Sequence, residues 1–260
     1  MAGFSMILFF YFQRESREGQ RGNLPIHICA KNGSIEMFRL LQKYDSVSFK
    51  QNNNLENALH IAASYNKSSF ISVFLKFERV LMDKNNVYED DNYVKCACDC
   101  GMEKDYVPCS KIKDSKDYTP LFTSVAALNQ ACFELLLEDD HVDLNAVDKS
   151  ENSIYHVATM FDNSEALKFL LNNYTNEKIF SKNVSDDTIL HCACRNGNVL
   201  MVKQILEKLL ETNASLDSFL LSKNKDGDTC FHILCANGFT NIVEYFLKDK
   251  KLTLFLGNVI

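Results

Sequence analysis

The stretch TILHCACRNGNVLMVKQIL, residues 188–206, places a histidine beside two cysteines in a mostly apolar segment. Such residues occur together in metal and thiol sites, and also in the packed core of helical proteins. Because His191 and Cys192 are adjacent, their side chains on a helix point about 100° apart and cannot share one metal ion or act as base and nucleophile without distortion. The rest of the sequence must decide between a chemical site and a structural element.

The same arrangement recurs along the chain. Five of the six histidines and one phenylalanine occupy the fourth position of a ten-residue pattern, and we call them the marker residues. They are His27, His60, Phe122, His156, His191 and His232, spaced by 33, 62, 34, 35 and 41 residues. Metal ligands converge on one point, whereas these residues recur with the same neighbours at the interval of a structural repeat. We therefore expect the marker residues to be structural.

Each repeat carries the signals of two helices. Three residues before the marker stands a residue able to cap a helix by accepting a backbone N–H, except for Leu24 in the first repeat. These residues are Asn57, Thr119, Ser153, Thr188 and Thr229. Ten, eleven and fourteen residues after the marker, all six repeats are apolar, from Met37, Phe38 and Leu41 in the first to Ile242, Val243 and Phe246 in the last. This spacing places them on one face of a second helix.

Turn signals separate the helices. Six residues after the marker stand residues that tolerate a left-handed backbone, Gly33, Asn66, Asp162, Gly197 and Gly238, with Leu128 as the exception. Eight residues before it, repeats two to six have Asn52, Asp114, Asp148, Asn183 and Asn224, whose side-chain oxygens can start a turn. Each unit is therefore predicted to run turn, helix, turn, helix.

The units resemble ankyrin repeats, whose signature T-P-L-H-x-A-A-x-x-G and period of about 33 residues they follow. The resemblance implies an all-α solenoid of about six helix–turn–helix units over residues 23–250, with an insertion at about 78–112 and short turns or hairpins between units. It also implies that the marker histidine is a buried hydrogen-bonding residue that ties neighbouring loops. Phe122 and Leu128 depart from the pattern, so repeat three should be the most distorted or least stable. Residues 1–22 form a non-repeat segment, and residues 251–260 form an apolar tail or a truncated further repeat.

Cysteines occur in the repeats and in the insertion. Cys29, Cys132, Cys192, Cys194, Cys230 and Cys235 replace small or aliphatic residues of the pattern, which favours core packing. In the insertion, Cys96, Cys98, Cys100 and Cys109 make a zinc site conceivable, although their spacing lacks paired C-x-x-C units. A mobile exposed loop and an ordered cap over the repeats are the alternatives.

The composition excludes several classes of function. A formal charge of −6 gives no basic field for nucleic acid. The apolar run at residues 2–12 is too short to span a bilayer and lacks the flanks of a signal peptide, so a cytoplasmic location is expected. No phosphate-binding, dinucleotide, zinc-protease or nucleophile-elbow motif is present, so we expect neither an enzyme nor a cofactor.

Binding of another protein is the function expected of such a solenoid. The candidate contacts follow the markers or lie near the turns: Tyr65, Met160, Phe161, Arg195, Lys149, Ser150, Lys225 and Asp226. The first hypothesis is a protein-interaction module or adaptor. The second is a cytoplasmic segment of a membrane protein, because LLSKNKDGDTCFHILCANGFTNIVEYFL, residues 220–247, is similar to the N-terminal ankyrin arrays of TRPA-type cation channels. Its partners would then be further domains of the same longer chain, with membrane contact only through the channel.

Overall fold

The structure is a computed structural model that describes residues 21–43, 50–86, 107–174, 177–211 and 219–248. Within these ranges the regular structure is helical and no strand is found, which confirms the predicted all-α class. The chain divides into two compact units, unit 1 at Met1–Asp143 and unit 2 at Leu144–Ile260. Each unit is described separately.

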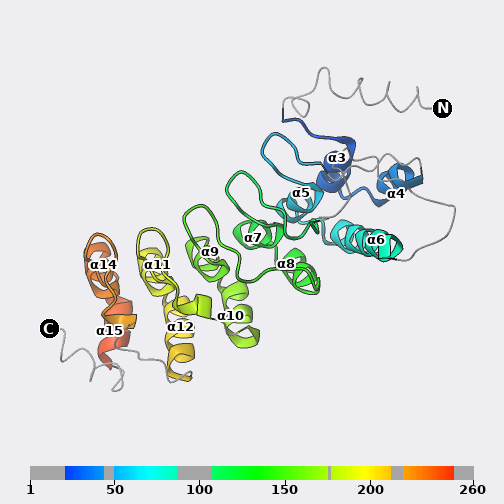
Figure 1. The fold of residues 1–260 in the computed structure, drawn as a ribbon. Coiled ribbons are helices and arrows are strands. Elements are labelled where there is room, and N and C mark those ends of the chain that lie inside the picture. The colour runs from blue at the N-terminus through cyan, green and yellow to red at the C-terminus, as the bar shows by residue number, and fades with distance from the viewer. Residues whose placement is uncertain (1–20, 44–49, 87–106, 175–176, 212–218, 249–260) are drawn as a thin grey trace. The chain divides into compact units, whose positions relative to one another are not determined.

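The described residues of unit 1 form three helix pairs (Figure 1). They are α3 (Pro25–Asn32) with α4 (Ile35–Lys43), α5 (Ala58–Ser64) with α6 (Ser68–Asn86), and α7 (Pro120–Ala126) with α8 (Gln130–Leu137). The first helices of successive pairs contact one another, as do the second helices. This packing lets each pair cover the apolar face of its neighbour, which a single pair cannot bury alone.

Unit 2 repeats the arrangement (Figure 1). Its pairs are α9 (Ile154–Met160) with α10 (Ser164–Asn173), α11 (Ile189–Asn196) with α12 (Val199–Glu211), and α14 (Cys230–Asn237) with α15 (Thr240–Lys248). A short 3₁₀ helix, η1 (Glu177–Phe180), lies in the connection between α10 and α11. Within the unit, α11 packs between α9 and α14, and α12 packs between α10 and α15.

The second helices bury the predicted apolar face. In repeats two to five, the residues ten, eleven and fourteen after each marker are at most 1% exposed. In repeat one Phe38 is buried and packs among Phe70, Phe74 and Phe77 at ring-centroid distances of 5.2 to 5.8 Å. Met37 is 50% exposed, contrary to the expectation. The equivalent residue of repeat three, Cys132, contacts Ala62 and Asn66 of the preceding repeat. No helix pair precedes α3 among the described residues, so Met37 has no such neighbour there.

A left-handed residue separates the helices of every pair. All six residues at this position have positive φ, between 54° and 70°. Leu128 is among them at 60°, so repeat three keeps the turn geometry with a residue that is poorly suited to it. A non-glycine residue other than Asn or Asp adopts this conformation at a cost of about 1–2 kcal/mol.

Replacing Leu128 with glycine should therefore stabilise the protein. The Leu128 side chain is 58% exposed, so little packing is lost when it is removed. We expect the free energy of unfolding to rise by about 1 kcal/mol, measured by urea denaturation followed by circular dichroism.

The matched control is Gly197→Ala at the same position of repeat five. Gly197 has a φ of 69°, and an added Cβ would lie 2.5 Å from the ring of Phe239. This variant should lose stability. A Leu128→Gly variant less stable than the original chain would show that the turn of repeat three is not strained.

Candidate interaction surface

A tight turn precedes the first helix of repeats two to six. In repeat four, Oδ1 of Asp148 accepts the backbone N–H groups of Ser150 and Asn152, both at 2.8 Å. The Asn or Asp at this position accepts the same two bonds in the other four turns. The predicted turn-starting role is confirmed. We call these turns the finger loops, residues 52–56, 114–118, 148–152, 183–187 and 224–228.

Neighbouring finger loops of unit 2 are hydrogen-bonded to each other. The N–H of Val184 donates to the carbonyl of Ser150 at 2.8 Å, and the N–H of Lys225 donates to that of Ser185 at 3.0 Å. Side chains add a parallel row, in which Asn183 Nδ2 donates to Asn152 Oδ1 at 2.8 Å and Asn224 Nδ2 donates to Asp187 Oδ1 at 3.1 Å. Each loop is thus held in register with the loop of the next repeat.

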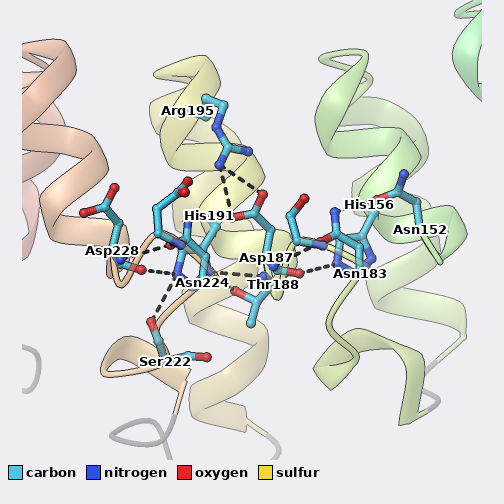
Figure 2. A network of polar contacts seen from close by, with 12 residues as sticks. Asn152, His156, Asn183, Asp187, Thr188, His191, Arg195, Ser222, Asn224 and Asp228 are labelled. Atoms are coloured by element: carbon cyan, nitrogen blue, oxygen red, sulfur yellow. Dashed lines mark hydrogen bonds and ion pairs between the residues drawn. The ribbon is translucent and has the colours of Figure 1, made fainter. Parts of the chain in front are cut away.

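The marker histidines of unit 2 connect one repeat to the next (Figure 2). Nε2 of His156 donates to the carbonyl of Asp187 at 3.1 Å. Nε2 of His191 donates to the carbonyls of Ser222 and Asp228 at 3.1 and 3.2 Å. A carbonyl oxygen can only accept, so the proton of each neutral ring lies on Nε2.

The other ring nitrogen completes the helix cap. Nδ1 of His156 accepts the N–H of Ser153 at 3.3 Å and lies 2.8 Å from its Oγ. Since this nitrogen carries no proton, the hydroxyl must donate to it. Thr188 with His191 and Thr229 with His232 have the same geometry. The N-cap positions are as predicted, and each of these three hydroxyls takes part in a capping box with the backbone N–H of its marker histidine and also bonds the imidazole.

Burial keeps both rings neutral. His156 and His191 are fully buried, and this desolvation lowers the pKa of each imidazole. The carbonyl bonds and the carboxylate of Asp187 oppose the shift without reversing it. Near neutral pH the rings therefore serve as hydrogen-bonding groups that link repeats, and not as proton carriers or metal ligands.

The marker residues of unit 1 make similar hydrogen bonds, but less regularly than those of unit 2. Nε2 of His60 donates to the carbonyl of Tyr118 at 2.8 Å, and Asn57 Oδ1 accepts the N–H of His60 at 3.1 Å. Nδ1 of His27 accepts the N–H of Leu24 at 2.9 Å, while its buried Nε2 has no partner among the described residues. In repeat three, where Phe122 replaces the histidine, Thr119 accepts the Phe122 N–H as first expected.

His232 differs from the other marker histidines. The expectation of a buried side chain is wrong for this residue, which is exposed. No helix pair follows α15 in the part of the chain that the structure describes, so nothing there covers the ring or accepts its Nε2 proton. Its Nδ1 still accepts the Thr229 N–H at 3.3 Å.

Arg195, four positions after the marker His191, lies on the side of α11 that faces the finger loop. Its guanidinium pairs with the buried carboxylate of Asp187 at 3.0 Å, at the base of the finger loop, while the Arg195 side chain stays 48% exposed. Sequence analysis predicted Arg195 as a partner contact and did not foresee this ion pair. Met160 holds the equivalent position in α9, which packs against α11, so Met160 and Arg195 belong to one row across these two helices.

The other predicted contact residues are on the surface. Met160 and Phe161 are 44% and 41% exposed. Lys149, Ser150, Lys225 and Asp226 are exposed in the finger loops of unit 2. In unit 1, Tyr65 is 43% exposed, and Lys31 Nζ lies 5.5 Å from the centre of its ring.

Comparison with known families agrees with this geometry. The family described as ankyrin repeats (3 copies) matches residues 4–87, 124–217 and 156–254, which is more than half of the chain. The chain belongs to the ankyrin-repeat family.

Two curated proteins match the ankyrin repeats of this chain, each across 71% of its length. One is a transient receptor potential cation channel subfamily A member 1 homolog of Caenorhabditis elegans, 25% identical over 197 residues. The other is the NAD-dependent deacetylase sir2B of Dictyostelium discoideum, 25% identical over 204 residues. The chain spans only 15% and 25% of these relatives. Since their names describe different activities, the likeness by itself indicates shared ankyrin repeats and no shared activity.

A solved structure has the same fold. The ankyrin repeat domain of Bcl-3, a member of the IkappaB protein family, superposes with a TM-score of 0.60. The alignment covers 90% of this chain and 86% of that chain, at 17% sequence identity. This likeness supports the ankyrin architecture and carries no statement about a partner.

The cysteines of the ankyrin repeats are mostly core residues. Burial raises the pKa of Cys29 and Cys132 to about 11 and that of Cys192 to about 12. Contact with the thiol of Cys230, followed by burial, raises the pKa of Cys194. Thiols in this state are poor nucleophiles at neutral pH. Cys235 is exposed, contrary to the core-packing prediction, because it faces the same uncovered side of α14 as His232.

The insertion is described only at its two ends. Its first residues continue α6 to Asn86, and its last residues pack against repeat two. Cys109 is buried, its N–H donates to the carboxylate of the buried Glu78 at 2.7 Å, and its carbonyl accepts from Asn57 Nδ2 at 2.8 Å. Cys96, Cys98 and Cys100 lie outside the described residues, so the zinc hypothesis stays a prediction.

Proposed function

We propose that this ankyrin-repeat protein binds another polypeptide through unit 2, acting as a non-catalytic interaction module in the cytoplasm. The observation that carries the proposal is the exposed pair Met160 and Phe161, which ends α9 in the row that continues with Arg195. Two adjacent large apolar side chains left 44% and 41% exposed gain from being covered by a partner.

The surroundings supply polar contacts for such a partner. Lys149 and Ser150 lie in the finger loop before α9, and Lys225 and Asp226 lie in the one before α14. Because Arg195 is fixed by Asp187, its exposed guanidinium edge is pre-ordered and costs little entropy when it binds an acidic group. The buried, free thiols of the described repeats suit a reducing compartment such as the cytoplasm.

Paired substitutions test the surface. The variant Met160→Ser/Phe161→Ser should lose capture of a partner by the purified protein. We expect at least a tenfold loss of affinity, because removing one interface anchor costs about 2 kcal/mol. Candidate partners from quantitative affinity capture would be purified and titrated by calorimetry.

The control is Leu200→Ser, which replaces a side chain that is 54% exposed on α12, outside this row. Its affinity should equal that of the original protein. A partner bound equally by the Met160→Ser/Phe161→Ser variant and by the original chain would place the interface elsewhere.

A second candidate is the cytoplasmic ankyrin segment of a TRPA-type cation channel. It is supported by the 25% identity to the Caenorhabditis elegans channel homolog over 197 residues. No helix among the described residues has the length and apolar character to cross a membrane. The full-length coding sequence tests this candidate: further repeats and six apolar spans after residue 260 would support it, and a stop codon after Ile260 would exclude it.

A further inference from the structure

Unit 2 exposes two large apolar side chains in the connections that precede repeats five and six. Phe180, the last residue of η1, and Leu221 both stand eleven residues before the marker of their repeat. Their side chains are 42% and 44% exposed. The residue before each of them, Ile179 or Leu220, is buried, so the two connections have the same register.

The ankyrin fold does not need an apolar side chain at this position. The equivalent residues of repeats three and four are Lys111 and Asn145, which are polar and exposed. Since polar residues serve the same position in those repeats, core packing does not explain Phe180 and Leu221.

Two contacts join the connection before repeat five to the connection before repeat six. The ring of Phe180 meets the ring of Phe219 edge-on, with centroids 6.2 Å apart, and Phe219 itself is buried. Nζ of Lys182 donates to the carbonyl of Lys223 at 3.0 Å. The two connections therefore present one surface, and we call Phe180, Lys182, Leu221 and Lys223 the connector patch.

The connector patch is positively charged in a chain whose formal charge is −6. Residues 178–185 and 219–225 contain four lysines and no Asp or Glu. Lys182 and Lys223 are exposed, each two residues after the apolar side chain of its connection. Neither pairs with an acid in the part of the chain that the structure describes, and the carbonyl that Lys182 bonds is neutral. Negatively charged groups would therefore be attracted to both ammonium groups.

The finger loops limit how wide an anionic partner can be. Asp187 is neutralised by Arg195 (Figure 2), but Asp186 and Asp226 add negative charge just after the two lysine-rich stretches. A broad anionic surface such as a membrane would meet these carboxylates together with the lysines. A polypeptide segment can contact the connector patch alone, so the charges favour a peptide over a lipid surface.

We propose that the connector patch binds an acidic segment of another protein. Large apolar side chains of that segment cover Phe180 and Leu221, and its Asp or Glu residues pair with Lys182 and Lys223. The proposal does not rest on the surface formed by Met160 and Phe161, and it adds a second surface for a partner of defined chemistry.

Three synthetic peptides of equal length test this chemistry, with Phe and Leu alternating with Glu, with Gln or with Lys. Fluorescence anisotropy of the labelled peptides with the full chain should show the Glu peptide binding about tenfold more tightly than the Gln peptide, the effect of two exposed ion pairs. The Lys peptide should bind more weakly than both. Raising the salt concentration from about 50 mM to about 500 mM should remove most of the difference.

Two double variants test the residues, and circular dichroism checks that each variant is folded. Phe180→Ser/Leu221→Ser should weaken all three peptides, with at least a tenfold loss for the Glu peptide. Lys182→Glu/Lys223→Glu should reverse the order of the Glu and Lys peptides. The matched control Lys168→Glu changes the charge of an exposed residue of α10 and should leave the affinities unchanged.

The outcomes separate this proposal from the proposed function. The Met160→Ser/Phe161→Ser variant should bind the Glu peptide as the original chain does. Equal affinity of the original chain for all three peptides would overturn the proposal, and so would a Glu peptide that binds the Lys182→Glu/Lys223→Glu variant undiminished. Binding to phosphatidylserine vesicles through the same residues, without binding of the Glu peptide, would overturn it in favour of a lipid surface.

Discussion

Lowering the pH from 7 to 4 is expected to destabilise the repeats through their buried histidines. The pKa of His27 is lowered from 6.5 to about 4, chiefly by burial, against the opposing charge of Glu56. Between these two pH values the unfolded chain binds a proton that the folded chain does not. The stabilisation that depends on a neutral His27 is therefore fully present above pH 6.5 and is lost as the pH falls towards 4. At 1.36 kcal/mol per pKa unit, His27 alone lowers the free energy of unfolding by about 3 kcal/mol.

Three further histidines add to the effect. Burial also lowers the pKa of His60, His156 and His191, although carbonyl bonds and nearby acids oppose it. The acids are Asp114 and Glu56 near His60, and Asp187 near the other two, with Asp148 near His156. Each of these three groups therefore lowers the stability further in the same direction as the pH falls below 6.5.

Urea denaturation followed by circular dichroism at pH 7, 6, 5 and 4 measures this loss, and the chain contains no tryptophan to offer a fluorescence probe. Most carboxylates keep their charge down to about pH 5, so the decline from 7 to 5 reports mainly on the histidines. A free energy of unfolding that stays constant from pH 7 to 5 would mean that these imidazoles titrate normally in the folded protein.

The His191→Ala variant is expected to lose about 3 kcal/mol of stability, measured by urea denaturation at pH 7. Removing the ring leaves the partly buried carbonyls of Ser222 and Asp228 without the donor that they share, and the Thr188 hydroxyl without its acceptor. It also leaves a cavity between α11 and α14, which pack against each other.

His232→Ala provides the matched control. This residue holds the same position of the repeat and keeps its bond to Thr229, but its ring is exposed and makes no bond to a following repeat among the described residues. The variant should lose less than about 1 kcal/mol. Equal losses at positions 191 and 232 would show that the cap within the helix, and not the link between repeats, supplies the stability.

The parts of the fold that depend on short stretches of chain could be predicted. Helix caps, left-handed turns and loop-starting Asn or Asp residues act within a few positions, and the repetition of each signal five or six times compensates for single departures such as Leu128. The period-3.6 apolar pattern likewise predicted the buried faces of the second helices. Met37 and His232 were misjudged because their burial depends on a neighbouring repeat, which the local pattern does not contain.

Contacts between distant residues were beyond the sequence argument. Glu78 and Cys109 are 31 residues apart, and nothing in either local pattern indicates that a carboxylate accepts a backbone N–H there. The ion pair between Arg195 and Asp187 was only weakly indicated by the sequence, because Asp187 precedes Arg195 by eight residues and lies before the start of α11. The capping hydroxyls were correctly placed, but their bond to Nδ1 follows from the tautomer, which is set by carbonyls of the next repeat.

The claim that the marker histidines are neutral links between repeats is tested most directly by the ¹⁵N spectrum of the imidazole rings. At pH 7 His156 and His191 should both appear as Nε2-protonated neutral rings, they should gain a second proton only below pH 6.5, and added Zn²⁺ should leave their signals in place. Rings that gain a second proton near pH 6.5, or marker histidines that shift together when zinc is added, would contradict it.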